Sequence, residues 1–347
     1  MKTHEFYIKR CIELAKNGLG TTYPNPMVGS VIVHNDEIIG EGWHRKSGEP
    51  HAEVNAINSV KDKSLLSKSI IYVSLEPCSH FGKTPPCCDL IIKNNIPNVV
   101  VGTIDSFAEV SGNGIKKLIE SGKKVIVGVL ENECIELNKR FFTFHEQQRP
   151  YIILKWAESQ DGFIAPISKE KQEPVWITNE ISRQLVHKWR SEEQAILVGT
   201  QTVLDDNPKL DIRNWTGTNP TRIVLDRTGK ISENYNVKDQ KVKTIVLTEQ
   251  ENLPTSDNLK YENCIFDTNL VSSICKILYK NEIQSIIIEG GKQTIQSFID
   301  ANLWDEARIF KGPIFFKNGT KAPEIKIENA IKKHILEDEF LKIYNYD

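Results

Sequence analysis

The first half of the chain carries residues that could hold a metal ion beside an acid. His51 and Glu53 lie two positions apart, Cys78 follows a proline, and Cys87 and Cys88 follow two more prolines. One imidazole and two thiolates suit Zn²⁺, and three protein ligands leave a fourth position for water. A carboxylate close to a ligand can reach such a water and move its proton. The spacing therefore predicts a hydrolytic zinc centre built on His51, Cys78 and a further cysteine, with Glu53 as acid and base.

The cysteine spacing departs from the usual pattern for this chemistry. Zinc-dependent deaminases carry His-x-Glu and then Pro-Cys-x-x-Cys, whereas eight residues separate Cys78 from Cys87 here. Cys88 competes with Cys87 as a ligand, and spacing alone leaves that choice open. A structural site closed by His51 and three cysteines is the alternative. It gives Glu53 no role, and adjacent cysteine side chains diverge, so we favour a catalytic zinc.

Length and composition limit the classes of protein to consider. The 347 residues suggest about two domains. With 44 basic and 46 acidic residues, no basic excess points to nucleic acid or an anionic membrane, so we expect neither as a partner. The apolar runs are too short to span a bilayer, and the start lacks the apolar segment of a signal peptide. Seven cysteines, an odd number, are typical of thiols in a reducing compartment. We therefore expect a cytoplasmic protein that acts on small molecules.

Alternating strands and helices can position the zinc centre in a first domain, residues 1–147. One predicted helix carries His51 and Glu53 in its first turn, and one predicted strand leads to Pro77 and Cys78. Such alternation is typical of an α/β layered domain. The predicted helices cover 3–17, 51–60 and 114–120, and the predicted strands cover 28–33, 38–39, 70–74, 99–102 and 124–129.

A second α/β domain is expected over residues 148–347, with the seam near 141–149. Thr178 is the expected N-cap of its first helix, and residues 202–210 carry the turn chemistry Asp-Asp-Asn-Pro. The predicted helices cover 178–190, 270–280 and 292–301. The predicted strands cover 151–156, 163–165, 195–199, 222–225, 244–247 and 285–289, with strand-like pieces at 325–327 and 341–344.

Gly290 and Gly291 join the last predicted strand to the last predicted helix. Glycines at such a junction let backbone N–H groups approach a phosphate at the positive end of the helix. The pair lacks the Gly-x-Gly-x-x-Gly fingerprint, and by itself it favours a plain tight turn.

Three strings in the first half resemble the deaminase half of the bifunctional riboflavin-biosynthesis deaminase–reductase family. They are N-P-M-V-G at 25–29, H-A-E at 51–53 and E-P-C-S-H-F-G-K-T-P-P-C at 76–87. That family carries the long loop in place of Cys-x-x-Cys, which accounts for the unusual spacing. The resemblance implies that Cys87 is the third zinc ligand.

The same resemblance implies that four polar side chains contact the deaminase substrate: Asn25, His44, His80 and Lys83. An amide suits the edge of a pyrimidine, and a lysine with a histidine suits a phosphate. Taken one by one, these residues would instead be a turn asparagine, two surface histidines and a solvated lysine.

Four strings in the second half resemble the reductase half of the same family. They are K-W-A-E-S-Q-D-G-F-I-A at 155–165, W-I-T at 176–178, T-V-L-D-D-N-P-K-L at 202–210 and E-G-G at 289–291. The resemblance implies a fold similar to dihydrofolate reductase and a reaction that uses NADPH to reduce the ribose of the deaminated intermediate. Pro174 departs from the family, which often has a small hydroxyl residue there, and this bears on one substrate hydrogen bond.

The reductase resemblance also implies two sets of contacts. Arginine forks suit a phosphate and an acid suits hydroxyl groups. The alternatives are a helix-end cation for Arg190 and core packing for Trp176. The sugar phosphate would meet Arg190, Leu210, Arg213 and Glu289. NADPH would meet Glu158, Trp176, Thr202, Asp206, Gly291, Lys292, Gln293, Thr294, Ile295, Gln296 and Ser297.

Together these resemblances imply a bifunctional, homo-oligomeric enzyme of riboflavin synthesis. A cytidine-deaminase-like three-layer domain would use Zn²⁺ to deaminate a diaminopyrimidinone ribosyl phosphate. A dihydrofolate-reductase-like domain would then reduce the ribosyl chain with NADPH. One alternative is a deaminase of another base or nucleoside with a catalytically silent second domain. Another is a zinc-stabilised binding module without chemistry.

Overall fold

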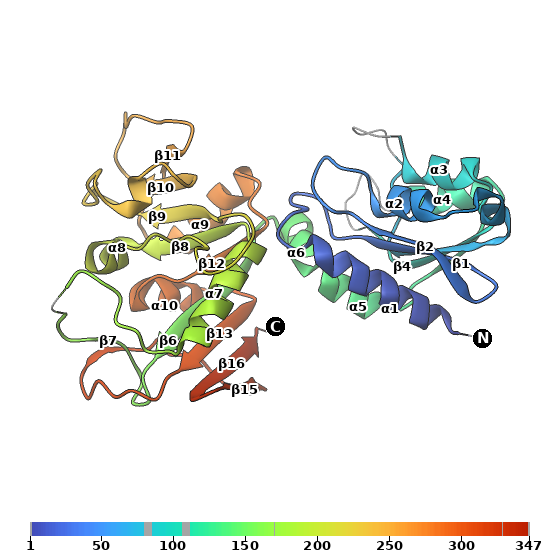
Figure 1. Ribbon diagram of the computed structural model, residues 1–347. Coiled ribbons are helices and arrows are strands. Elements are labelled where there is room, and N and C mark those ends of the chain that lie inside the picture. Colours follow the sequence, from blue (N-terminus) through green and yellow to red (C-terminus); the bar gives the residue numbers. More distant parts are fainter. Residues whose placement is uncertain (1, 80–84, 106–111, 170, 328, 346–347) are drawn as a thin grey trace. The chain divides into compact units, whose positions relative to one another are not determined.

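The chain forms two compact units. The computed structural model describes residues 2–79, 85–105, 112–169, 171–327 and 329–345 (Figure 1). Chain contacts divide it into Met1–Gln148 and Arg149–Asp347. The helix α6, Lys139–Gln147, occupies the region where the sequence suggested a seam.

The first unit is built on a five-stranded sheet in the order β2-β1-β3-β4-β5. Strand β1 runs antiparallel to β2 and β3, and β3, β4 and β5 are parallel. Asn35 and Asp36 join β1 to β2 with φ angles of 50° and 62°, which suit a two-residue hairpin turn. The strands are β1 Gly29–His34, β2 Glu37–Trp43, β3 Ile70–Leu75, β4 Asn98–Thr103 and β5 Lys124–Val127.

Helices cover both faces of this sheet, which makes three layers (Figure 1). Alternation along the strands explains the layering, because Val31 packs with α1 and α5, whereas Ile32 packs with α2, α3 and α4. The helices are α1 His4–Ala15, α2 Ala52–Ser59, α3 Cys87–Lys93, α4 Asn113–Glu120 and α5 Glu131–Leu137. Short 3-10 helices cover Lys16–Gly18 and Lys63–Lys68.

The second unit is built on a nine-stranded sheet in the order β11-β10-β9-β8-β12-β6-β13-β16-β15. The strands from β11 to β13 are parallel, and β16 and β15 add an antiparallel edge. They are β6 Tyr151–Glu158, β8 Ala195–Gly199, β9 Thr221–Leu225, β10 Thr244–Thr248, β11 Leu259–Asn263, β12 Ser285–Ile288, β13 Glu306–Lys311, β15 Ile331–Ile335 and β16 Asp338–Tyr344. A separate pair joins β7, Phe163–Pro166, to β14, Gly319–Lys321.

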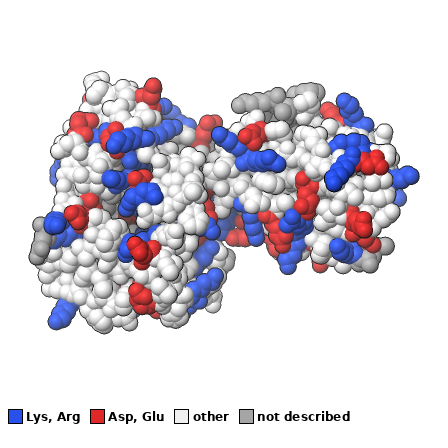
Figure 2. All heavy atoms as spheres, in the orientation of Figure 1, with Lys and Arg blue, Asp and Glu red and all other residues white. Residues whose placement is uncertain are grey.

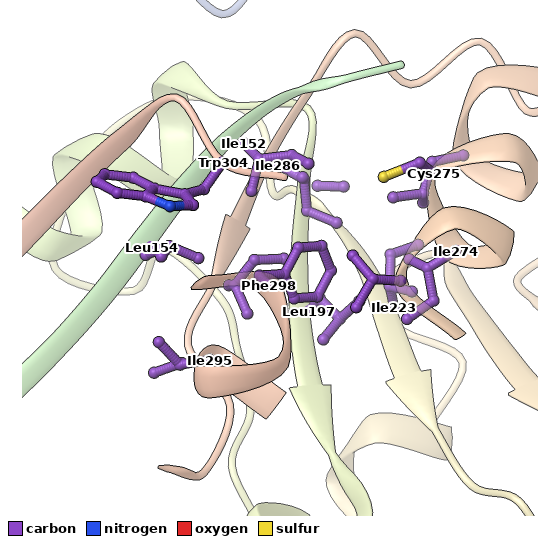
Figure 3. Packing of buried hydrophobic residues seen from close by; sticks show 14 of the residues in the cluster. Ile152, Leu154, Leu197, Ile223, Ile274, Cys275, Ile286, Ile295, Phe298 and Trp304 are labelled. Atoms are coloured by element: carbon purple, nitrogen blue, oxygen red, sulfur yellow. The ribbon is translucent and has the colours of Figure 1, made fainter. Parts of the chain in front are cut away.

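Helices also cover both faces of the second sheet. Phe298 of α10 and Ile274 of α9 pack against Leu197 and Ile223 of the sheet (Figure 3). On the opposite face, Val186 of α7 packs with strand residues. The helices are α7 Glu180–Glu192, α8 Thr200–Asp206, α9 Leu270–Lys280 and α10 Lys292–Asp300, with a 3-10 helix at Asn236–Lys238. Ligands of such sheets bind beyond the carboxyl ends of the parallel strands.

Several local predictions were wrong or incomplete. Asn179, not Thr178, caps α7, because its side chain accepts a hydrogen bond from the Ser182 N–H at 3.0 Å. Residues 325–327 form no strand. The expected turn at 202–210 begins as the helix α8, which ends before Asn207, a residue with a positive φ angle. The strands β11, β13, β14 and β15 were not predicted. Strand β13 carries the charged residues Glu306 and Arg308, which are not typical of a buried strand. Both side chains are buried and form an ion pair at 2.6 Å.

Surface charge and helix length agree with the composition. On the face shown in Figure 2, basic and acidic side chains are interspersed over each unit. No helix in the described ranges combines the length and the apolar character that crossing a bilayer requires.

Candidate active sites

His51, Cys78 and Cys87 come together in the first unit. His51 is the N-cap of α2, Cys78 follows β3, and Cys87 begins α3. The His51 Nδ1 atom lies 3.6 Å from the Cys78 sulfur and 3.4 Å from the Cys87 sulfur, and the three ligand atoms lie within 4.8 Å of one another. Tetrahedral zinc with ordinary bond lengths holds nitrogen and sulfur about 3.6 Å apart. The three side chains therefore fit a zinc ion with one position left open.

Hydrogen bonds favour the thiolate form of Cys78. The thiol of Cys87 and the ring of His51 both donate toward it, and they lower the pKa of Cys78 to about 4. The backbone N–H of Cys87 also donates to the Cys78 sulfur at 3.3 Å. A metal binds the thiolate, not the thiol, so this ligand is prepared before a metal arrives.

Glu53 is buried beside these three residues, in the first turn of α2. Burial raises the pKa of Glu53 to about 7, while the charge of His51 opposes the shift. A carboxyl group with a pKa near neutrality can both accept and donate a proton. This is the property that an acid and base of hydrolysis needs.

Cys88 points elsewhere. Its buried sulfur contacts the carbonyl oxygens of Pro77 at 3.2 Å and Gly114 at 3.5 Å. The Cys88 thiol therefore links the loop before Cys78 to the start of α4, away from the His51, Cys78 and Cys87 group.

Glu76 holds the loop that carries Cys78, and sequence reasoning missed it. Its buried carboxylate accepts hydrogen bonds from the backbone N–H groups of Gly112, Gly114 and Ile115 at 3.0, 2.9 and 3.2 Å, and from Asp105 at 3.3 Å. An acid directly before Pro-Cys was the available signal. Its partners lie 29 to 39 residues away in the chain, so the sequence could not name them.

Asn25 and His44 lie next to the group formed by His51, Cys78 and Cys87. The Asn25 amide nitrogen is 3.1 Å from Nε2 of His44, whose ring packs edge-on against His51 at 5.4 Å. Burial lowers the pKa of His44, which favours the neutral form of its ring. Nδ1 lies 3.3 Å from the Pro50 carbonyl and acts as donor there, so Nε2 accepts from Asn25. Among the described residues, none donates a hydrogen bond to the amide oxygen of Asn25.

Asn138 explains how the turn with Asn25 is held. Its buried side chain accepts from the Met27 N–H at 2.8 Å and donates to the Met27 carbonyl at 2.9 Å. Gly29 follows, and a Cβ atom there would lie 2.0 Å from the Cys11 carbonyl oxygen of α1. The predicted substrate residues His80 and Lys83 lie outside the described residues.

The second unit contains a cavity of about 1590 Å³ at the carboxyl ends of β6, β8, β9 and β12. Twelve residues that the sequence assigned to NADPH or to the sugar phosphate line it: Trp176, Arg190, Thr202, Asp206, Leu210, Arg213, Glu289, Gly291, Lys292, Gln293, Thr294 and Ser297.

Three residues of the expected cofactor set do not line this cavity. Glu158 instead accepts a hydrogen bond from the Trp156 ring N–H at 2.9 Å. Ile295 is packed in the core between α10 and the sheet. Gln296 donates to Asp300 at 2.8 Å. Residues 291–297 form the start of α10, so only part of this string faces the cavity.

Glycines open the space between the ends of β8 and β12. A Cβ on Gly290 would lie 3.2 Å from the Gly199 nitrogen, and a Cβ on Gly199 would lie 2.7 Å from the Thr294 hydroxyl oxygen. Gly291 is the N-cap of α10 and has no side chain to cap its first N–H groups. Bare backbone N–H groups at a helix start suit a diphosphate. The cavity therefore fits a dinucleotide phosphate.

A buried ionic group lies at the β6 and β12 end of the cavity. Glu289 accepts two hydrogen bonds from Arg190, at 2.8 and 3.2 Å, and lies 3.9 Å from the Lys155 ammonium. Burial opposes ionisation of Glu289, but Arg190 and Lys155 outweigh it and lower its pKa to about 2. Burial lowers the pKa of Lys155. Lys155 was quoted in the family string but received no role from the sequence.

His187 was also missed, although it lines the cavity one turn before Arg190. Its Nδ1 atom lies 2.9 Å from the Asp211 carbonyl oxygen, which also accepts from Arg190 at 3.1 Å. Burial, with the charges of Arg190 and Arg213, lowers the pKa of His187 to about 4. A neutral His187 adds no further positive charge beside Arg190 and Arg213, which pair with Glu289 and Asp211.

Trp176 lines the cavity. Its side chain is 55% exposed and the Arg183 guanidinium stacks over the ring at 4.8 Å, so core packing does not explain it. Pro174 lines the cavity too. Lys169 and Asp206, which both line the cavity, form an ion pair.

Comparisons with known proteins match both units. The family model for the cytidine and deoxycytidylate deaminase zinc-binding region matches residues 1–103. The family model for the RibD C-terminal domain matches residues 150–336.

Full-length relatives and solved structures agree with the family models. The riboflavin biosynthesis protein RibD of Aquifex aeolicus is 39% identical over 94% of this chain and 92% of its own, and that of Escherichia coli K12 is 36% identical over 89% and 87%. The crystal structure of a Thermotoga maritima diaminohydroxyphosphoribosylaminopyrimidine deaminase/5-amino-6-(5-phosphoribosylamino)uracil reductase is 37% identical. It covers 98% of each chain with a TM-score of 0.88. A structure of Acinetobacter baumannii RibD is 29% identical, with a TM-score of 0.84 over 99% of each chain. The two units are therefore a zinc-binding deaminase domain and a reductase domain, and the chain belongs to the riboflavin biosynthesis protein RibD family.

Proposed function

We propose that the chain carries out two successive reactions of riboflavin synthesis. The first unit removes an amino group hydrolytically from 2,5-diamino-6-(5-phosphoribosylamino)pyrimidin-4-one. The second unit reduces the ribosyl group of the product to a ribityl group with NADPH. The membership of the family supports both activities.

In the first unit, His51, Cys78 and Cys87 hold Zn²⁺, and Glu53 moves the protons. When bound, the metal supplies Lewis-acid activation of a water molecule. Glu53 accepts a proton from the attacking water and delivers one to the amino group that leaves as ammonia. The hydrogen bond between the Asn25 amide nitrogen and His44 fixes the orientation of the amide, which supports a role in binding the edge of the pyrimidine. We also assign His80 and Lys83 to the substrate, from the family resemblance alone.

In the second unit, we propose that the backbone at the start of α10, with Trp176, Thr202 and Asp206, binds NADPH. The cofactor supplies a hydride when bound. Arg190 and Arg213 are assigned to the substrate phosphate and Glu289 to sugar hydroxyls, with Leu210 at the wall. Lys155 lies against Glu289, and its lowered pKa supports a role as the group that gives a proton when the hydride reaches the sugar carbon.

Glu158, Ile295 and Gln296 do not line the cavity, so we leave their side chains out of the proposed cofactor contacts. Their side chains are engaged outside the cavity, so substitution of the Gln296 side chain should not change NADPH binding.

One observation carries the proposal: a buried acid with a raised pKa lies beside three zinc-fitting ligand atoms that leave a position open. The test is to supply purified protein, loaded with zinc, with the diaminopyrimidinone and to measure ammonia release and NADPH oxidation. Both should occur. Ammonia release without NADPH oxidation would instead favour a deaminase with a silent second domain. Zinc without either activity would favour a binding module.

We further propose a cytoplasmic homo-oligomer that acts on small molecules and not on nucleic acids or membranes. All seven cysteines are free thiols, which suits a reducing compartment. Ile119, Ile126 and Val127 of the first unit are 56%, 45% and 38% exposed, and exposed apolar side chains of this kind support self-association. Sedimentation velocity of the whole chain tests the oligomeric state, with a monomer as the contradicting result.

A further inference from the structure

The turn between β6 and β7, residues 159–162, lies in one of the reductase-like strings, but none of its residues lines the reductase cavity. Ser159 is fully buried, and its hydroxyl donates to Oδ1 of Asp161 at 2.6 Å and accepts the Phe163 N–H at 3.0 Å. Gly162 supplies the φ of +82° that closes the turn. These contacts hold the Asp161 carboxylate in a fixed orientation.

The Asp161 carboxylate binds the backbone of a segment far away in the chain. Its Oδ1 atom accepts the Phe316 N–H at 3.2 Å, and its Oδ2 atom accepts the Lys317 N–H at 2.7 Å, from residues 155 and 156 positions later. The neighbouring Gln160 N–H donates to the Ile314 carbonyl oxygen at 2.8 Å. The turn after β6 therefore holds the loop that connects β13 to β14.

This loop leads directly into the pair formed by β7 and β14. Thr320 lies opposite Ala165, and Gly319 lies opposite Pro166. A Cβ atom on Gly319 would lie 2.1 Å from the Ala165 carbonyl oxygen, so the two strands approach closely. The pair is a separate two-stranded sheet, and two strands alone are only marginally stable. Its position therefore depends on contacts at its ends, among them those of Asp161.

The β7–β14 pair lines the reductase cavity, although Asp161 does not. Ile164 and Ala165 of β7 and Thr320 of β14 all line it. Strand β7 contacts β6, whose residues Lys155 and Ala157 line the same cavity. The pair therefore borders the end of the cavity that holds Lys155, the proposed proton donor.

We propose that Asp161 is a positioning residue of the reductase reaction. By holding the loop before β14, it fixes the β7–β14 pair beside Lys155, and the pair determines how the reacting ends of cofactor and substrate lie against each other. Hydride transfer requires the reacting atoms to lie about 3–3.5 Å apart, and a displacement of about 1 Å can cost about 100-fold in rate. This inference rests on the proposed reductase function and adds a residue that acts through its neighbours.

Kinetics and cofactor binding of the full-length protein test this role together. With the deaminated intermediate as substrate, Asp161→Ala should lower the reductase kcat about 10- to 100-fold. The Kd of NADPH, measured by calorimetry, should change less than about threefold, because the proposed contacts at the start of α10 do not use this turn. Asp161→Asn should recover part of kcat, because its amide oxygen can still accept one N–H. Asp257→Ala, an exposed acid of the same unit that does not line the cavity, is the matched control.

An isotope effect separates positioning from a loss of stability. The reductase rate is compared between NADPH and NADPH deuterated at both hydrogens of nicotinamide C4. If the reacting ends are misplaced, hydride transfer becomes slower and limits the rate more strongly, so the isotope effect on kcat should rise above the wild-type value in Asp161→Ala. A variant that is only less stable contains fewer active molecules, and each of these would show the wild-type isotope effect.

Amide hydrogen exchange tests the contact itself, without cofactor or turnover. In Asp161→Ala the amides of Phe316 and Lys317 should exchange at least about tenfold faster, because both lose a charged acceptor. Exchange at Ile287 in β12 should keep its wild-type rate, which would show that the second unit is folded. If Asp161→Ala does not fold, Asp161→Asn is measured in its place, with smaller changes in the same direction.

The contradicting outcomes are distinct. If the wild-type protein oxidises NADPH and the Asp161 variants keep its kcat, or lose kcat with an unchanged isotope effect, the positioning role is wrong while the reductase function stands. Unchanged exchange at Phe316 and Lys317 would likewise show that another group holds the loop. If the wild-type protein oxidises no NADPH, the proposed reductase function fails, and the role of Asp161 fails with it.

Discussion

The backbone N–H of Cys87 donates a hydrogen bond to the sulfur of Cys78 at 3.3 Å, across the long loop that separates the two residues in the chain. The contact joins the first residue of α3 to the loop after β3, and both sulfurs face the same nitrogen of His51. Cys78 and Cys87 therefore lie together beside His51, although eight residues separate them in the chain.

The two adjacent cysteines should differ sharply in metal binding. Cys87→Ser should lose most of its zinc and its deaminase activity, because the ligand group loses one of three sulfur and nitrogen donors. Cys88→Ala should keep about one zinc per chain, since its sulfur contacts the Pro77 and Gly114 carbonyls instead. Elemental analysis of the purified variants measures this. Loss of zinc from Cys88→Ala with retention in Cys87→Ser would reverse the assignment.

The Glu76 carboxylate should control the loop that presents Cys78. Glu76→Ala leaves the N–H groups of Gly112, Gly114 and Ile115 without their acceptor. Hydrogen bonds to a charged group contribute about 1.5–3 kcal/mol each, so these amides should exchange with solvent at least tenfold faster. Amide hydrogen exchange measures the effect directly.

Deaminase activity of Glu76→Ala should fall and reductase activity should persist, because Glu76 belongs to the first unit alone. Glu120→Ala, an exposed acid on α4, is the control. Unchanged exchange at Gly114 and Ile115 in Glu76→Ala would show that another group holds the loop.

Much of this organisation could be predicted from the sequence, because the informative residues are local strings. His51 and Glu53 share one helical turn, and alternating apolar residues mark the strands of both sheets. The partners of Glu76 and Asn138 could not be predicted, because each of these side chains bonds to backbone far away in the chain. Backbone partners leave no signal in the identity of a residue.

Tertiary context also decided where charged residues form strands. Strand β13 carries Glu306 and Arg308, which periodicity assigns to the surface. Both are buried, and Glu306 bonds to Arg308 and pairs with Lys342 of β16 at 3.2 Å. A cross-strand ion pair between segments distant in sequence cannot be read from either segment alone.

Removal of the Glu289 charge should damage the reductase specifically. Glu289→Gln leaves Arg190 and Lys155 buried without their anion. Breaking a buried ion pair costs about 3–5 kcal/mol, so the second unit should unfold at lower denaturant concentration and reductase activity should fall at least about 100-fold. Deaminase activity should not change. Glu251→Gln, an exposed acid of the same unit, is the control. A fully active Glu289→Gln would exclude Glu289 from the substrate site.

Acid should destabilise the second unit through His187. Its pKa in the folded protein is about 4, below the ordinary value, so the unfolded chain takes up a proton first. The stabilisation is complete above about pH 7 and is lost as the pH falls from about 6.5 toward 4. Between pH 7 and 5 the free energy of unfolding should fall by about 2 kcal/mol.

Tryptophan fluorescence can follow this unfolding, because Trp156, Trp176, Trp189, Trp215 and Trp304 lie in the second unit and Trp43 alone lies in the first. His187→Gln keeps a donor for the Asp211 carbonyl and should flatten the dependence over this range. His334→Gln, an exposed histidine of the same unit, should leave it unchanged. An equal slope in wild type and His187→Gln would assign the acid sensitivity to another group.

The most direct test of two chemically separate sites is NADPH oxidation by Glu53→Gln with two substrates in turn. Glu53 is buried beside His51, Cys78 and Cys87 in the first unit, whereas the cavity lined by Trp176 and Glu289 belongs to the second. With the deaminated intermediate, the variant should oxidise NADPH at the wild-type rate. The variant should retain its zinc. With the diaminopyrimidinone, it should oxidise no NADPH, because no deaminated intermediate forms. Wild-type NADPH oxidation from the diaminopyrimidinone would contradict the account.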